Sequence, residues 1–97
     1  MGLILHRLIK RDLRTVLTHY EEEVGPDLAA RFQREFEELA LRIERNPRRF
    51  LFISGVIRRA NFPSFPYHLL YRETEGGARV LVLRHHHRRP SYGTQRQ

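Results

Sequence analysis

The stretch that decides the fold is PYHLLYRETEGGARVLVLRHHH, residues 66–87, which predicts a β-hairpin. Two strand-like runs, Pro66–Glu73 and Arg79–His86, flank the sequence Glu75-Gly76-Gly77-Ala78. Glycines between two such runs are a strong hairpin signal, because tight hairpin turns need residues that adopt positive φ. The segment VLVL in the second run does not alternate apolar with polar residues, so we expect a central strand covered on both faces.

Residues 9–46, upstream of this hairpin, show the periodicity of two amphipathic helices. The first apolar stripe consists of Ile9, Leu13, Val16, Leu17, Tyr20 and Val24, and the second of Leu28, Phe32, Phe36, Leu39 and Ile43. Gly25-Pro26 suits the joint between the helices, since Gly tolerates a left-handed cap and Pro fits a first helical turn. Because Asn46-Pro47 ends the second helix, we expect an antiparallel helical hairpin.

Shorter strand-like segments complete the predicted fold. We expect a first strand at Leu3–Leu8 and another at Val56–Phe62, with FLFI at residues 50–53 as irregular chain or a strand edge. The order is β-α-α-β-β-β, an α+β fold with the helical hairpin packed on one face of a small antiparallel sheet. We expect one domain over residues 1–92 and a frayed tail at residues 93–97.

Composition and charge restrict the classes of function. The chain has no cysteine, which excludes disulfides and thiolate metal sites, and no apolar run reaches the ~18 residues of a membrane span. We therefore expect a cytoplasmic protein without a membrane partner. Residues 1–46 carry 8 basic and 9 acidic groups, whereas residues 47–97 carry 10 basic and 2 acidic groups. Such a basic C-terminal half favours nucleic acid or an acidic protein as partner.

The pattern FPYHLLYRE…RVLVLRHHHRRPSYG resembles the RelE/ParE superfamily of toxins from type II toxin–antitoxin modules. The matching positions are Phe65, Pro66, Tyr67, Tyr71, Arg72, His85, Arg88, Pro90 and Tyr92. The helical hairpin is similar to that of the family as well, so the resemblance covers nearly the whole chain. Three positions depart from the pattern. Gly93 stands where a Trp often follows the Tyr, and many relatives have an acidic residue at the position of Arg89 and Gly or another small polar residue at the position of His86.

The resemblance implies one of two activities. ParE-like toxins poison DNA gyrase and are not nucleases, whereas RelE-like toxins cleave mRNA on the ribosome. The FPY opening and the His-x-x-Arg-x-Pro ending are closer to the ParE-like branch, which makes a gyrase poison the first hypothesis. In the RelE-like alternative, the catalytic positions carried over are His68, His86 and Tyr92. Whether the chain is an enzyme stays open.

The resemblance also implies a partner, a small cognate antitoxin. Its toxin-binding segment is expected to be acidic and to cover the toxin by helix-in-groove contact or by strand addition. Hypotheses of another class are a basic nucleic-acid-binding module and an inactive toxin relative, because Gly93 and the histidine replacements mark departures from active relatives.

A group of cations gives candidates for binding the target or a phosphate. They are Arg58, Arg59, Arg72, Arg84, His85, Arg88 and Arg89. Any one of these arginines is more often part of a solvated face, but as a group they predict an anion-binding surface.

The histidine run raises the alternative of a metal site. In a strand, His85 and His87 point to one side, and a turn at Gly76-Gly77 would set His68 opposite His85. Three histidines on one face suffice for a catalytic zinc. No neighbouring carboxylate is evident as a second shell, so we expect neither a metal nor another cofactor.

Overall fold

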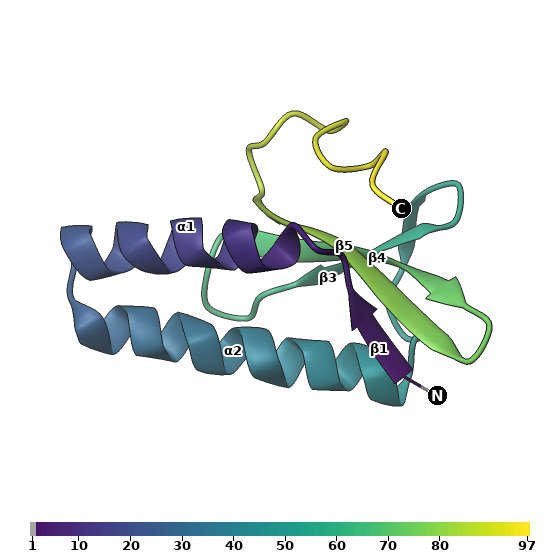
Figure 1. The fold of residues 1–97 in the computed structure, drawn as a ribbon, viewed down its shortest axis with the longest axis horizontal. Coiled ribbons are helices and arrows are strands. Elements are labelled where there is room, and N and C mark those ends of the chain that lie inside the picture. The colour runs from purple at the N-terminus through teal and green to yellow at the C-terminus, as the bar shows by residue number, and fades with distance from the viewer. Residues whose placement is uncertain (1) are drawn as a thin grey trace.

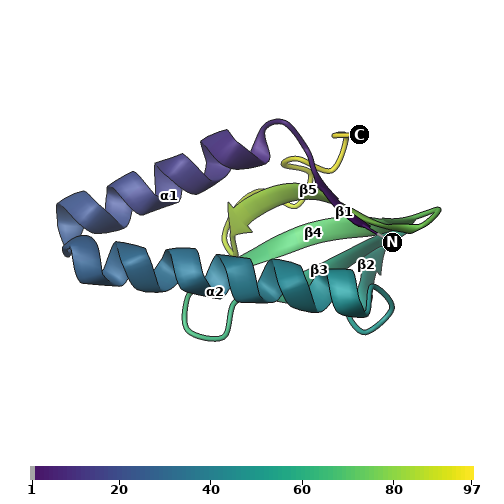
Figure 2. The ribbon, with the colours of Figure 1, turned by 60° about the horizontal axis from the view of Figure 1, so that its bottom comes forward.

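The computed structural model describes residues 2–97, which form two helices and a five-stranded sheet (Figure 1). The elements are β1 (Gly2–Leu5), α1 (Ile9–Glu23), α2 (Pro26–Arg45), β2 (Phe52–Ser54), β3 (Ile57–Asn61), β4 (Tyr67–Thr74) and β5 (Gly77–His85). The predicted α+β class and element order are confirmed. The helices lie together in one layer against the sheet (Figure 2).

The sheet is mixed, where the sequence predicted a purely antiparallel one. Its order is β1-β5-β4-β3-β2, and β1 runs parallel to β5 while every other pair is antiparallel. The helical hairpin connects β1 to β2, which lie at opposite edges of the sheet, and the parallel pair joins the first strand of the chain to the last. Gly77 permits this pairing, because a Cβ at that position would collide with the backbone of Gly2.

The register of the β4–β5 hairpin differs from the predicted one. Thr74 pairs with Gly77, so the turn is Glu75-Gly76, and Gly76 has a φ of 92°. Further along, Tyr71 pairs with Val80 but Leu70 with Val82, which leaves one extra residue in β5 as a bulge. Turn and bulge together decide which side chains share a face of the sheet.

The helical hairpin forms as the sequence predicts. Gly25 caps α2 with a φ of 147°, a conformation that favours glycine, and Pro26 begins the helix. Asn46 follows the last turn, and its backbone N–H donates to the carbonyl of Arg42. Neither described helix is long and apolar enough to cross a membrane.

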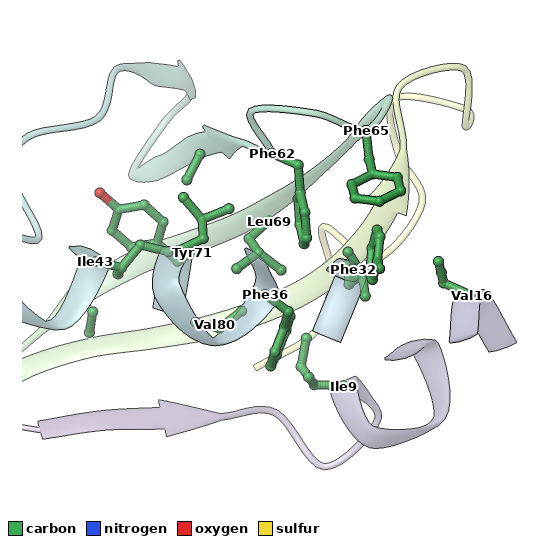
Figure 3. Packing of buried hydrophobic residues seen from close by; sticks show 14 residues of the cluster. Ile9, Val16, Phe32, Phe36, Ile43, Phe62, Phe65, Leu69, Tyr71 and Val80 are labelled. Carbon is green, nitrogen blue, oxygen red and sulfur yellow. The ribbon is translucent and has the colours of Figure 1, made fainter. Parts of the chain in front are cut away.

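Phe32 on α2 lies at the centre of the core (Figure 3). Its ring stacks on Phe62 with centroids 4.6 Å apart and meets Phe65 edge-on at 4.9 Å. Both of these phenylalanines lie in the loop between β3 and β4, so aromatic contacts anchor this loop to α2. The core continues along the sheet through Leu69, Tyr71, Val80 and Leu83.

The C-terminal segment packs on the molecule, which differs from the expected frayed tail. Arg96 donates to the Asp12 carboxylate at 2.7 Å and to the carbonyl of Leu81 at 3.1 Å. Asp12 also accepts the Leu83 N–H at 3.2 Å. Gly93 lies on Val82, and a Cβ there would come within 2.7 Å of that side chain. A larger residue at position 93 therefore cannot occupy this path.

The Asp12–Arg96 ion pair should contribute to stability because both side chains are largely buried, at 5% and 10% exposed. We expect Arg96→Ala to lower the free energy of unfolding by about 2–4 kcal/mol, since it leaves a buried carboxylate without its cation. Urea denaturation measures the change, and Gln95→Ala is the exposed control. We expect Asp12→Asn to lower the free energy of unfolding less in the Arg96→Ala variant than in the native chain. Strictly additive effects would contradict the coupling.

Candidate functional site

The sheet face opposite the helices, here called the outer face, collects basic side chains. Because Leu69, Tyr71 and Val80 point into the core, their strand neighbours point outward. The outer-face residues are Arg59 on β3, His68 and Arg72 on β4, and Arg79 and Arg84 on β5. The structure thus brings four arginines from three adjacent strands onto one face.

A pair of histidines lies on this face where the strands end. The Nδ1 atoms of His68 and His86 are 2.9 Å apart, and the rings stack with centroids 5.1 Å apart. Arg84 Nε donates to His68 Nε2 at 2.8 Å. Arg59 Nη2 lies 3.1 Å from His86 Nδ1. Each imidazole is therefore in contact with a guanidinium.

These contacts determine where the protons lie. An arginine only donates, so His68 Nε2 must accept and neutral His68 carries its proton on Nδ1. That proton points to His86 Nδ1, which also accepts from Arg59, and the remaining proton of His86 lies on its Nε2. Burial, followed by the charges of Arg59 and Arg84, lowers the pKa of His68 from 6.5 to about 3. Burial and then Arg59 also lower the pKa of His86.

The pair is consequently poor at acid–base chemistry near neutral pH. His68 is 1% exposed, and both of its ring nitrogens are engaged within the protein. A general acid or base needs a pKa near the working pH and access to the substrate, and His68 has neither. His86 can still offer its Nε2–H as a hydrogen-bond donor.

Two of the candidate anion-binding arginines are used inside the protein. Arg84 is 6% exposed, and its Nη1 donates to the carbonyls of Arg89, Pro90 and Tyr92. Arg58 is buried on the helix side of the sheet. Its guanidinium donates to the carbonyls of Arg48 and Phe50 and to Glu73, and lies 3.8 Å over the ring of Phe52. Both residues hold turns in place and are closed to a ligand.

The other candidates differ in position and access. Arg59 and Arg72 are half-buried on the outer face, and Arg88 and Arg89 are exposed in the turn after β5. His85 lies on the helix side, with its ring 4.9 Å from that of Tyr67.

Tyr92 is not brought to the histidine pair. The Arg88 guanidinium covers its ring at 4.2 Å, and Arg96 lies 5.5 Å from the ring centroid. Among the described residues, the hydrogen bonds and ring contacts of His68 and His86 do not include Tyr92. The three positions carried over from RelE-like toxins thus do not form one cluster.

The geometry required for the alternative of a zinc site is not formed. The turn at Glu75-Gly76 and the bulge set His68 opposite Arg84 and place His85 opposite Tyr67. His68 and His85 therefore point to opposite faces. Within residues 2–97, no group of three His, Asp or Glu side chains is arranged to hold a metal ion.

Sequence reasoning did not find Asp12 or Arg96. Asp12 is 8% exposed although it falls in a helix rich in exposed charges, and its partner lies 84 residues away. The available signal was an Asp on the edge of the apolar stripe, one position before Leu13.

The lowered pKa of His68 predicts a pH dependence of stability. A folded-state pKa below 6.5 means that the stabilising contribution of His68 is complete above about pH 6.5 and is lost as the pH falls toward 3. His68→Gln should therefore flatten the fall in the free energy of unfolding between pH 7.5 and 5.0, by up to about 1.4 kcal/mol per pH unit. Urea titrations at each pH measure this. Exposed His19→Gln is the control, and an unchanged slope in His68→Gln would refute the assignment.

Comparison with known proteins now identifies the family. The family model described as the ParE toxin of the type II toxin–antitoxin system, parDE, matches residues 3–90. A solved structure of the chromosomal ParDE TA system from P. aeruginosa superposes with a TM-score of 0.78 at 17% sequence identity, over 88% of this chain and 95% of that chain. No curated protein matches the sequence. The chain belongs to the ParE toxin family of type II toxin–antitoxin systems.

Proposed function

We propose that this ParE-type toxin arrests growth by poisoning DNA gyrase and that a cognate antitoxin neutralises it. We choose gyrase over mRNA as the target because His68 and His86 contact each other and two arginines. Cleavage of mRNA requires groups that take up and release protons, and His68 is buried with a pKa of about 3. A gyrase poison requires only a binding surface. The proposal places the toxin in the cytoplasm with the bacterial DNA.

The arginine-rich surface supports a target that carries negative charge. Residues 47–97 have 10 basic and 2 acidic groups, and Arg59, Arg72, Arg88 and Arg89 remain accessible at least in part. Gyrase engaged with DNA presents such a charge. A surface of this kind speeds association and weakens binding at high salt.

Parallel readouts after induction test the proposal. We expect the purified chain to make gyrase accumulate cleaved plasmid DNA, and induced cells to show an SOS response while mRNA stays intact. Topoisomerase I is the control enzyme, and we expect it to relax plasmid DNA normally in the presence of the chain. Codon-linked cuts in mRNA without trapped DNA would favour the ribosomal endonuclease instead. Unimpaired growth at confirmed soluble expression would favour an inactive relative.

The edge strand β2 supports an antitoxin-docking site. Leu51, Phe52, Ile53 and Val56 are 81%, 56%, 44% and 67% exposed, although such residues are usually buried. β2 pairs with β3 on one side and ends the sheet, so its other side can accept an added strand. Exposed arginines border this edge, including Arg49. An extended segment with apolar anchors and acidic residues is complementary to it.

Binding of the cognate antitoxin tests this docking site. Leu51→Asp combined with Phe52→Asp should weaken binding by roughly 30-fold or more, because two apolar anchors are replaced by charges that repel an acidic segment. Val24→Asp is the matched control, since Val24 is 66% exposed at the tip of the helical hairpin. Calorimetry measures both. If only Val24→Asp weakens antitoxin binding, the docking site lies on the helical hairpin and not on β2.

A further inference from the structure

A cavity of about 400 Å³ opens between the first half of α1 and the end of β5. Val16 and Leu83 form an apolar part of its lining, and both are buried. Polar groups come from α1, from β4, from β5 and from the turn that follows it. A pocket of this size, with an apolar wall and a few converging polar groups, is typical of ligand sites.

Two of its polar groups are donors on rings that neighbouring groups hold in place. His85 Nδ1 accepts the backbone N–H of His87 at 3.0 Å, so the neutral ring carries its proton on Nε2. Burial lowers the pKa of His85, which keeps this neutral form at neutral pH. The Tyr67 ring packs edge-on against His85, and Tyr67 is part of the cavity lining. His85 lines the cavity as well.

Two guanidiniums, one on α1 and one in the turn after β5, add positive charge to the lining. Arg88 lies 4.2 Å over the Tyr92 ring, which orients it, and no described carboxylate forms an ion pair with it. Arg11 projects from α1, with a side chain 57% exposed and 3.9 Å from Asp12. Arg11 and Arg88 are both part of the cavity lining.

Asp12 is the one carboxylate among the described residues that line the cavity, and its charge is already balanced. It holds Arg96 at 2.7 Å and the Leu83 N–H at 3.2 Å. The cavity therefore presents donors and cations against an apolar wall. A ligand rich in hydrogen-bond acceptors and negatively charged is what this arrangement fits.

We propose that the cavity binds a phosphate group, held by Arg11 and Arg88 with Tyr67 and His85 as additional donors. The donors come from three parts of the fold, namely α1, the β4–β5 pair and the turn after β5. Phosphate offers more oxygens to such a set of donors than the two oxygens of a carboxylate. The apolar wall of Val16 and Leu83 strengthens these interactions by excluding water. This site is independent of the gyrase proposal, because binding is measured on the toxin alone.

Titration with sodium phosphate at pH 7 and constant ionic strength tests the site, with the ring signals of His85 followed by NMR. We expect saturable shifts with a dissociation constant on the order of 1 mM. Arg88→Gln and Tyr67→Phe should each weaken binding by roughly tenfold, since each removes a donor to a charged group. Tyr67→Phe keeps the packed ring, so it remains informative if Arg88→Gln does not fold. Arg14→Gln, an exposed change on α1 outside the lining, is the matched control and should bind like the native chain.

Several outcomes would overturn the assignment. Equal weakening by Arg14→Gln would mean diffuse attraction to a basic surface, and the absence of saturable shifts would mean that no site exists. Tighter binding of acetate than of phosphate would show that the cavity is a carboxylate site and not a phosphate site. If the site is confirmed, AMP and a short DNA bearing a 5′-phosphate distinguish the two sources of the group. Competition by either, but not by DNA that ends in a hydroxyl, supports the proposal and names the source.

Discussion

Strand β5 is central to the sheet, but β1 covers only its first half. β5 has nine residues, and β1 pairs with Gly77 to Val80 alone. Buried backbone groups must find partners, so the second half of β5 needs donors and acceptors from elsewhere. Asp12 on α1 accepts the Leu83 N–H, and Arg96 donates to the Leu81 carbonyl. This one requirement ties the first helix and the C-terminal segment to the same strand.

The placement of the C-terminal segment has consequences for the surface. Arg84 holds the carbonyls of Arg89, Pro90 and Tyr92, and Gly93 lies directly on Val82. The segment that follows Arg88 is therefore held by Arg84 at residues 89–92 and by the Arg96–Asp12 pair near its end. It forms a wall of the cavity beside α1. Arginine thus serves this protein in two ways, as a buried support of turns and as an accessible cation.

The histidine run shows how neighbouring, identical residues acquire different roles. His85 points to the helix side, where it meets Tyr67, whereas His86 joins His68 on the outer face. His68 does not take up or release a proton near neutral pH, because Arg84 and His86 occupy its two ring nitrogens. The run His85–His87 suggests metal binding when it is read along the chain. In the fold, His85 offers a hydrogen-bond donor on the helix side of the sheet, whereas His86 pairs with His68 on the outer face.

The element order, the helical hairpin and the aromatic core were predictable from the sequence, because they depend on local periodicity and on Gly25-Pro26 and Asn46-Pro47. The basic surface was predictable as a group, but not which arginines are free: Arg58 and Arg84 are buried by contacts with distant segments. The histidine faces were mispredicted, because a turn at Glu75-Gly76 and a one-residue bulge shift the register, and each shift by one residue reverses the facing of a side chain. The Asp12–Arg96 pair joins residues 84 positions apart. Local pattern by itself determined the α+β class and the order of the elements of this toxin. Only the tertiary structure decided the parallel pairing of β1 with β5, the register of β4 on β5 and the burial of side chains, and therefore which charges and histidines are available to a ligand.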